Sequence, residues 1–176
     1  MKPGKMNKGI IICGTDTNIG KTIVSGLIIQ GLKGIYWKPI QSGLEGNGDT
    51  GRIIELLNLS NDRYLPEAYK FQAPVSPHWA AELEGTSIDI SKLKLPITKR
   101  PLIIETAGGL MVPLSRNLLQ IDQLKSWNLP VILVAKTTLG TLNHTLLSLE
   151  ALKTDSQIDP DSHSPSPIRQ KTLNLS

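Results

Sequence analysis

The sequence predicts a three-layer α/β fold in which helices cover both faces of a mostly parallel sheet. Short continuous apolar runs, which are typical of buried parallel strands, alternate with segments whose apolar residues recur at helical spacing. A glycine-rich turn joins the first such run to the first helical segment, as in P-loop NTPases. The predicted strands cover residues 9–13, 34–38, 101–105 and 130–135. The predicted helices cover residues 22–32, 49–59, 77–83, 118–127 and 142–153.

The first half of the chain supplies two strand–helix pairs. The run at residues 9–13 is entirely apolar and ends at Gly14, and the strand at 34–38 is stopped by Pro39. Both following segments carry apolar residues three and four positions apart, which favours helices. These residues are Ile23, Val24, Leu27 and Ile28 in the first helix and Ile53, Ile54, Leu56 and Leu57 in the second.

The second half repeats the alternation after a mixed segment. Residues 60–99 contain four prolines, so only a short helix at 77–83 is expected there. The strand at 101–105 ends in Glu105 and is followed by the turn Thr106–Gly109. A helix, a strand and a further helix follow, which completes the pattern of a parallel sheet covered on both sides.

The chain divides into a basic arm at residues 1–8, one nucleotide-binding domain at 9–153 and a polar tail at 154–176. The tail has only four aliphatic residues, with three prolines and five serines, so we expect it to be disordered. The strand that alternation calls for after the last helix, and any helices beyond it, are therefore expected to be missing. Such a loss exposes a sheet edge, which predicts lower stability.

Composition excludes several classes of protein. One cysteine and three scattered histidines allow neither a disulfide framework nor a zinc finger. The net charge is +4, but Lys2, Lys5 and Lys8 lie in an arm without acids, so the body lacks the basic surface of a nucleic-acid-binding protein. No apolar run reaches the length of a membrane span, and a cytoplasmic location is expected.

The segment Gly14–Thr22 has the composition and context of a phosphate-binding loop. Its backbone N–H groups and the following helix N-terminus would face anionic oxygens, and Gly20 permits a close approach. Lys21 would reach the β- and γ-phosphates, and the Thr22 hydroxyl would ligate Mg²⁺. Five residues rather than four separate Gly14 from Gly20. The alternative is an ordinary strand–turn–helix junction that contains Gly-Lys-Thr.

Three charged residues are expected near this loop, each with a plainer alternative. Glu105 ends a buried strand, a position at which nucleotide-binding α/β folds have a carboxylate near the metal. Its alternative is an acid exposed at the end of a strand. Asp49 opens a helix and is either an N-cap or a second Mg²⁺ partner. Lys38 ends the second strand at the ligand-binding edge of the sheet, or extends to solvent.

Together these motifs resemble the dethiobiotin synthetase family over roughly residues 7–152. The resemblance is carried by Gly14–Thr22, Lys38–Gly43, Ser76–His78, Glu105–Gly109, Leu129–Val134 and Leu139–His144, in family order. The five-residue gap in the phosphate loop is a feature that this family shares. The family closes the ureido ring of dethiobiotin from diaminopelargonate, CO₂ and ATP, in biotin biosynthesis.

The resemblance implies a role for each matching residue. Lys38 and Lys21 would be catalytic, Thr22, Asp49 and Glu105 would hold Mg²⁺, and Thr17 and Ser42 would contact substrate. ATP would be bound by Asn18, Ile19, Gly20, Lys21, Thr22, Ile23, Asp49, Glu105, Thr106, Ala107 and Gly108. Gly140, Thr141 and Asn143 would reach the substrate's carboxylate across the interface of a homodimer.

Two departures from the family pattern leave alternatives open. Thr106 stands where the family has glycine, and the polar tail replaces the family's adenine-recognition loop and later elements. A non-catalytic or impaired relic of the family is one alternative. A related P-loop ATPase with another substrate is the other.

Overall fold

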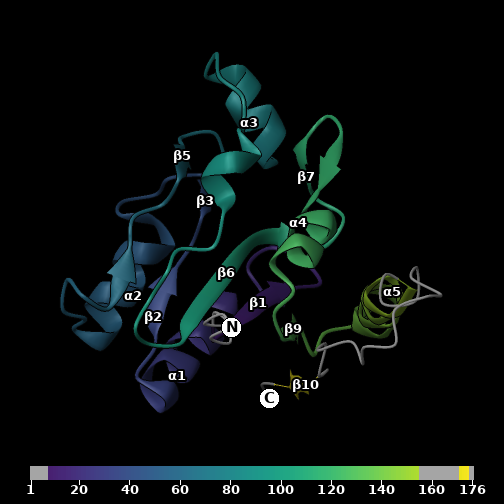
Figure 1. Ribbon diagram of the computed structural model, residues 1–176. Coiled ribbons are helices and arrows are strands. Elements are labelled where there is room, and N and C mark those ends of the chain that lie inside the picture. The colour runs from purple at the N-terminus through teal and green to yellow at the C-terminus, as the bar shows by residue number, and fades with distance from the viewer. Residues whose placement is uncertain (1–7, 155–170, 175–176) are drawn as a thin grey trace, which may run out of the picture.

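A six-stranded parallel sheet forms the centre of the protein in the computed structural model, which describes residues 8–154 and 171–174 (Figure 1). Its strand order is β10-β9-β1-β6-β2-β4. The strands are β1 (Gly9–Gly14), β2 (Ile35–Trp37), β4 (Tyr64–Leu65), β6 (Leu102–Gly109), β9 (Val131–Ala135) and β10 (Lys171–Asn174). Two small sheets lie beside it: β3 (Ile40–Ser42) pairs with β5 (Tyr69–Phe71), and β7 (Pro113–Ser115) pairs with β8 (Leu118–Leu119).

The helices lie between these strands in the expected order. They are α1 (Lys21–Leu32), α2 (Gly48–Leu57), α3 (Pro77–Leu83), α4 (Gln120–Trp127) and α5 (Thr141–Thr154), with a 3₁₀ turn at Ile90–Leu93. The prediction of a three-layer α/β fold with a mostly parallel sheet is confirmed, and each predicted helix and strand is present within a few residues of its expected bounds. None of the helices in the described part of the chain is long and apolar enough to cross a membrane.

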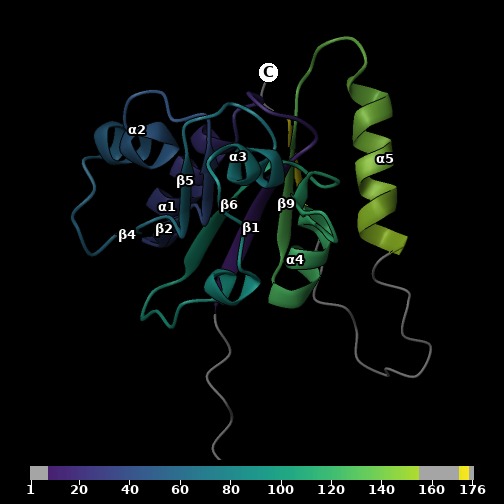
Figure 2. The ribbon, with the colours of Figure 1, turned by 90° about the horizontal axis from the view of Figure 1, so that it is seen from above.

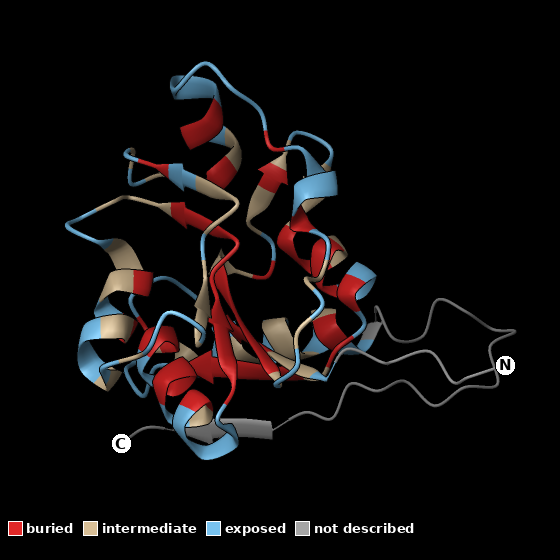
Figure 3. Cartoon of the chain, turned by 60° about the vertical axis from the view of Figure 1, so that its left-hand side comes forward, coloured by how far each residue is buried: buried red, intermediate tan, exposed pale blue. Residues whose placement is uncertain are grey.

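Each face of the sheet has its own apolar core. Because successive side chains of a strand point to opposite faces, Ile11 and Cys13 pack on one side and Ile12 on the other. The first core includes residues of α3, α4 and α5, and the second joins the sheet to α1 and α2. Figure 3 shows the buried strands at the centre, with most of the exposed residues on helices and in loops. α5 lies at the β9 end of the sheet, on the side away from α2 (Figure 2).

Strand β1 occupies the middle of the sheet and sets the position of the loop that follows it. It pairs in parallel with both β6 and β9, with Ile12 opposite Glu105 and Cys13 opposite Leu133. β6 also pairs with β2, so the carboxyl ends of β1, β2, β6 and β9 meet at one edge. In open α/β sheets this edge binds ligands.

The expectation that the tail adds no strand is wrong for residues 171–174. They form β10, which pairs in parallel with β9, with Lys171 opposite Ile132 and Asn174 opposite Ala135. β9 is therefore not the sheet edge that the sequence predicted. Residues 171–174 are too few and too polar to show the alternation of apolar and polar residues that indicates a strand. The backbone groups along an unpaired edge of a sheet, however, can hydrogen-bond to an extended segment of almost any sequence. The rest of the proposed tail, 155–170 and 175–176, lies outside the described residues, as do residues 1–7 of the basic arm.

Ile104 offers a test of the two-layered core. It is fully buried at the centre of β6. Ile104→Ala leaves a cavity between the sheet and the covering helices and is expected to reduce the free energy of unfolding by about 2–5 kcal/mol, measured by urea denaturation. Ile97→Ala is the matched control, since Ile97 is 89% exposed. Equal stabilities of the two variants would contradict the core assignment.

Candidate functional site

The loop between β1 and α1 wraps around the Lys21 side chain. Lys21 Nζ donates a hydrogen bond of 2.7 Å to the Asp16 carbonyl, and the Asp16 carboxylate is 3.8 Å from Lys136 Nζ. At Gly14 a Cβ atom would lie 2.5 Å from Ile19 Cδ1 and 3.0 Å from the Asp16 carbonyl oxygen, so a side chain there would force the loop or Ile19 to shift. Lys21, at the start of α1, and Lys136, directly after β9, thus place two ammonium groups beside Asp16 of the loop.

The N-terminus of α1 is open toward this loop. Gly20 precedes the helix with φ 92°, a conformation that favours glycine, and none of the described side chains caps the helix there. Asn18 also has a positive φ of 51°. The first N–H groups of a helix have no partner within the helix and attract anions. Of the predicted ATP-binding residues, Asn18, Ile19 and Gly20 form this loop, and Lys21, Thr22 and Ile23 form the first turn.

Glu105 is the centre of a buried polar network. Its carboxylate is 1% exposed and projects from β6 toward α1 and β2. Oε1 lies 2.9 Å from Thr22 Oγ1 and 3.1 Å from Lys38 Nζ. Oε2 accepts hydrogen bonds from Ser25 Oγ at 2.9 Å and from Tyr36 OH at 3.0 Å. Four donors compensate the loss of water around one buried carboxylate. The alternative of an exposed strand-end acid is wrong.

Lys38 lies between two carboxylates. Its ammonium is 2.7 Å from Asp49 Oδ2 and 3.1 Å from Glu105 Oε1, and the residue is 4% exposed. Asp49 is held at the start of α2, where its backbone N–H donates to Gln41 Oε1 at 3.2 Å. Thr22 Oγ1 lies 3.3 Å from Asp49 Oδ1. Lys38 therefore does not extend to solvent, and the structure brings it together with Thr22, Asp49 and Glu105.

Burial and charge act in opposite directions on the acids and bases of this network. Burial alone would lower the pKa of Lys38, but the carboxylates of Glu105 and Asp49 outweigh it and raise the pKa above its ordinary value. Burial likewise works against ionisation of Asp49, but the Lys38 ammonium holds the pKa of that carboxyl below its usual range. Lys38 and Asp49 are therefore an ion pair at neutral pH.

Lys21 is in a different electrostatic environment. Burial, reinforced by the positive charge of Lys38, lowers the pKa of Lys21 to about 8. Cys13, at the end of β1, is wholly buried, and burial raises the pKa of its thiol to about 12. The thiol therefore stays protonated, which makes it inert as a nucleophile.

The oxygen atoms of this network fit a magnesium ion. The Thr22 hydroxyl lies within hydrogen-bond distance of both the Asp49 and the Glu105 carboxylates, and Mg²⁺ prefers such oxygen ligands. Within residues 8–154 and 171–174, no group of three or more histidine, cysteine, aspartate or glutamate side chains forms a metal cluster. A small number of protein ligands is typical of a magnesium ion that is also bound to phosphate oxygens and water.

A cavity of about 380 Å³ adjoins the phosphate loop and contains Thr17, one of the predicted substrate contacts. Its walls come from the phosphate loop, from the end of β6 and the residues after it, and from α5. They are Thr15, Asp16 and Thr17; Gly109, Leu110, Met111 and Val112; and Leu147, Ser148 and Ala151. Ser42, which the sequence also predicted to contact substrate, lies at the end of β3. Its hydroxyl is buried and has no hydrogen-bond partner in the described part of the chain.

The remaining predicted residues lie at the carboxyl end of β6 and at the start of α5. Thr106, Ala107 and Gly108 continue β6 beyond Glu105. Thr106 is buried, and its hydroxyl has no hydrogen-bond partner among the described residues. Gly140, Thr141 and Asn143 lie before or within the first turn of α5 and do not line the cavity beside Thr17.

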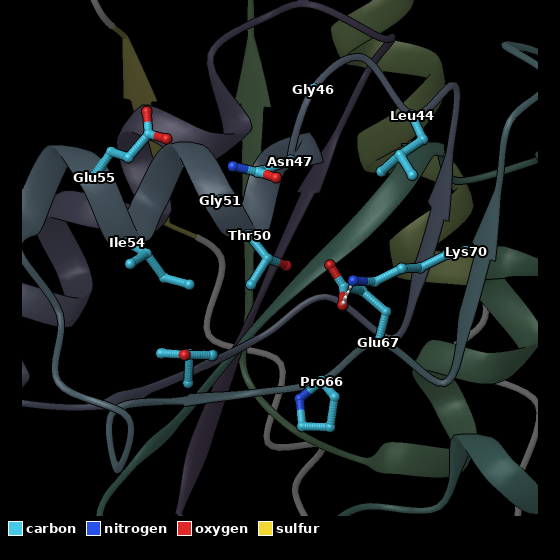
Figure 4. A pocket seen from close by; sticks show the side chains of 11 residues that line it. Leu44, Gly46, Asn47, Thr50, Gly51, Ile54, Glu55, Pro66, Glu67 and Lys70 are labelled. Carbon is cyan, nitrogen blue, oxygen red and sulfur yellow. Dashed lines mark ion pairs between the residues drawn. The ribbon is translucent and has the colours of Figure 1, made fainter.

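A second cavity, of about 360 Å³, lies on the outer side of α2 and contains none of the predicted site residues (Figure 4). Thr50 and Ile54 of α2 face Pro66, Glu67 and Lys70 across it. Lys70 Nζ pairs with Glu67 Oε2 at 3.1 Å. The cavity is separate from the phosphate loop, although Thr50 directly follows Asp49.

Three residues in the network were missed by sequence reasoning: Ser25, Tyr36 and Gln41. A signal for two of them was present, because Ser25 follows Thr22 by three positions on a helix and Tyr36 precedes Lys38 by two on a strand. Such spacings place side chains on the same face. Gln41 gave no comparable signal.

Comparisons with known proteins identify the family. Residues 8–160 match a protein-family model described as an AAA domain. The chain is 50% identical over 148 residues to the ATP-dependent dethiobiotin synthetase BioD of Rhodopseudomonas palustris strain BisA53, covering 84% of this chain and 70% of the relative. The chain belongs to the dethiobiotin synthetase family. The chain is 49% identical to the ATP-dependent dethiobiotin synthetase BioD of Nitrobacter hamburgensis, again over 84% of this chain and 70% of the relative. The synthetase of Bradyrhizobium diazoefficiens is 51% identical over 149 residues, covering 84% of this chain and 71% of the relative.

The family assignment confirms the resemblance that the sequence motifs indicated. The segment matched by the family model includes the phosphate loop and every residue of the Glu105 network. The buried Lys38 and Glu105 therefore lie in the part of the chain that is shared with the family.

The lowered pKa of Lys21 leads to a direct prediction. With methyl-labelled lysines observed by NMR, one resonance is expected to titrate near pH 8, because burial and the Lys38 charge disfavour the protonated form of Lys21. Lys21 is charged below that pH and loses its proton as the pH rises through it. The resonance should be missing in Lys21→Arg. A Lys21 that titrates at the ordinary lysine pKa would contradict the geometry of the loop.

Proposed function

We propose that this protein catalyses the ATP-dependent carboxylation and ring closure of 7,8-diaminopelargonate with CO₂ to give dethiobiotin. One observation carries the proposal: in a member of the dethiobiotin synthetase family, a buried lysine at the end of β2 reaches the two carboxylates beside the phosphate loop. Lys38, Asp49 and Glu105 thereby share a single site with Thr22 and Lys21.

The reaction has three steps that conserve atoms and charge. One amine of the diamine attacks the carbon of CO₂ and loses a proton, which gives a carbamate. A carbamate oxygen then attacks the γ-phosphorus of ATP, and ADP leaves. The second amine attacks the carbonyl carbon and loses a proton, and inorganic phosphate departs as the ureido ring closes.

The main physical demand is neutralisation of negative charge, because a carbamate oxygen must approach an anionic phosphate. Lys21 lies within the phosphate loop, and Lys38 projects from the adjacent strand, so two ammonium groups face the reacting oxygens. Positive groups that are held in place before the reaction stabilise the developing charge without reorganisation. No side-chain nucleophile is required, in agreement with the protonated, buried Cys13.

Thr22, Asp49 and Glu105 would hold Mg²⁺. When bound, the ion would supply positive charge to the β- and γ-phosphate oxygens. Asp49 and Glu105 also hold the Lys38 ammonium in place, where it would neutralise the charge of the carbamate.

The cavity beside Thr17 is the candidate site for the diamine. It adjoins the phosphate loop, and its polar wall includes Asp16 and Thr17, while Leu110, Met111 and Val112 supply an apolar wall for the substrate's hydrocarbon chain. In a homodimer, Gly140, Thr141 and Asn143 would reach this substrate from the partner subunit. The exposed leucines at the start of α5 support such an interface, since four of them are at least 63% exposed: Leu139, Leu142, Leu146 and Leu147.

The first test is formation of dethiobiotin, measured by mass spectrometry. The purified protein is given ATP, Mg²⁺, bicarbonate and diaminopelargonate. Lys38→Ala is expected to lower the rate by at least about 100-fold, because it removes a positive group aimed at the reacting oxygens. Lys99→Ala, which alters an exposed lysine in the loop before β6 that is not part of the Glu105 network, is the control and should retain full activity.

The possible results separate the proposal from its alternatives. Product that disappears in Lys38→Ala supports the synthetase. Binding of ATP without any product supports a relic of the family. Hydrolysis of ATP that does not depend on the diamine supports a P-loop ATPase with another substrate.

The homodimer is tested by sedimentation equilibrium. Leu146→Glu places a charge in the exposed leucine surface of α5 and is expected to shift a dimer toward the monomer, because burying an unpaired charge is unfavourable. Leu56→Glu is the matched control on α2, where the leucine is similarly exposed. A wild-type protein that sediments as a monomer at micromolar concentration would exclude this interface.

A further inference from the structure

The two oxygen atoms of the Glu105 carboxylate have different surroundings. Oε1 faces the catalytic side, toward Thr22 and Lys38. Oε2 faces the interior between α1 and β2, where it accepts one hydrogen bond from Ser25 and one from Tyr36. Neither of these two hydroxyls contributes to the family motifs on which the site was predicted.

We propose that Ser25 and Tyr36 are positioning residues, which fix the Glu105 carboxylate so that only Oε1 is presented to the metal and to Lys38. The proposal rests on the function proposed above, because it assigns Glu105 as a magnesium ligand.

The geometry accounts for this one-sided arrangement. Ser25 and Tyr36 are both fully buried, and each hydroxyl lies 3.0 Å or less from Oε2. A carboxylate without such anchors rotates about its terminal torsion and exchanges its two oxygens, because that torsion has a broad, two-fold profile. Two donors on Oε2 oppose this rotation. Each donor is itself fixed, Ser25 by helix α1 and Tyr36 by the sheet, where it pairs with both Ile103 and Tyr64.

The direction of the two hydrogen bonds favours the same arrangement. A carboxylate oxygen can only accept, so the hydroxyls of Ser25 and Tyr36 both donate to Oε2. A hydroxyl that can only donate to a carboxylate is a fixed anchor. Outer hydrogen bonds of this kind orient metal ligands, and their loss weakens metal affinity by about 10–100-fold.

The test measures metal binding without turnover. Mn²⁺ is titrated into the protein with ADP and followed by electron paramagnetic resonance. Ser25→Ala and Tyr36→Phe remove one donor each without adding volume, and each is expected to weaken Mn²⁺ binding by about tenfold. Loss of both is expected to weaken it further. ADP affinity in the presence of EDTA should stay at the wild-type value, because neither residue touches the phosphate loop.

Two matched variants control for the loss of a hydroxyl as such. Tyr64→Phe removes a phenol that bonds Asn61, and Ser60→Ala removes a hydroxyl that bonds Asp62, both at the surface. They should bind Mn²⁺ as the wild type does. Thermal unfolding without metal shows that each variant is folded at the temperature of the titration. If Tyr36→Phe does not fold, Ser25→Ala gives the same measurement on the other anchor.

The outcomes are distinguishable. Folded anchor variants that bind Mn²⁺ with wild-type affinity would overturn the positioning role while leaving the proposed function intact. An equal loss of ADP affinity with and without metal would also overturn it, because the effect would then be merely structural. A wild-type protein that binds ADP but no Mn²⁺ would overturn the metal site, and this inference with it.

Discussion

The arrangement of the site depends on one buried carboxylate, that of Glu105, and on the hydrogen bonds that replace its water. Glu105 is removed from water in the middle of the sheet, and an ion buried in this way is tolerated only when its oxygens are fully hydrogen-bonded. Its four donors come from α1, which carries Thr22 and Ser25, and from β2 and the residue after it, which supply Tyr36 and Lys38. Small displacements of these elements would leave a buried charge unsatisfied. The same contacts therefore hold the fold together and assemble the site.

The charges of the site are nearly balanced before any ligand arrives. Lys38 is neutralised by Asp49 and Glu105, and Lys21 is held by a backbone carbonyl and has a lowered pKa. Under the proposed function, the phosphates of ATP would bring negative charge to Lys21 and to the uncapped N-terminus of α1, and Mg²⁺ would bring positive charge to the carboxylates of Asp49 and Glu105. The site would then stay close to neutral when both are bound.

The sequence predicted the parts of the fold that have a period or a motif. The apolar runs of β1, β6 and β9 and the spacing in α1 and α2 were sufficient to place the layers, and Gly14–Thr22 placed the loop. Strands of two to four residues, such as β4 and β10, are too short for any period and are formed by pairing with a neighbour. The anchors of Glu105 were missed for another reason. The spacing places Ser25 on the face of Thr22 and Tyr36 on the face of Lys38, but only the three-dimensional packing brings both hydroxyls to the same oxygen.

The network also has a consequence for how the chain folds. The hydrogen bond between Thr22 and Glu105 joins residues 83 positions apart, and that between Tyr36 and Glu105 joins residues 69 apart. Contacts between such distant parts of a chain form slowly, because the closure entropy of long loops must be overcome first. The individual strand–helix pairs can form locally, but none of them contains a working site. The complete network can therefore form only when β6 has paired with both β1 and β2, and a nascent chain lacks this site until that strand is in place.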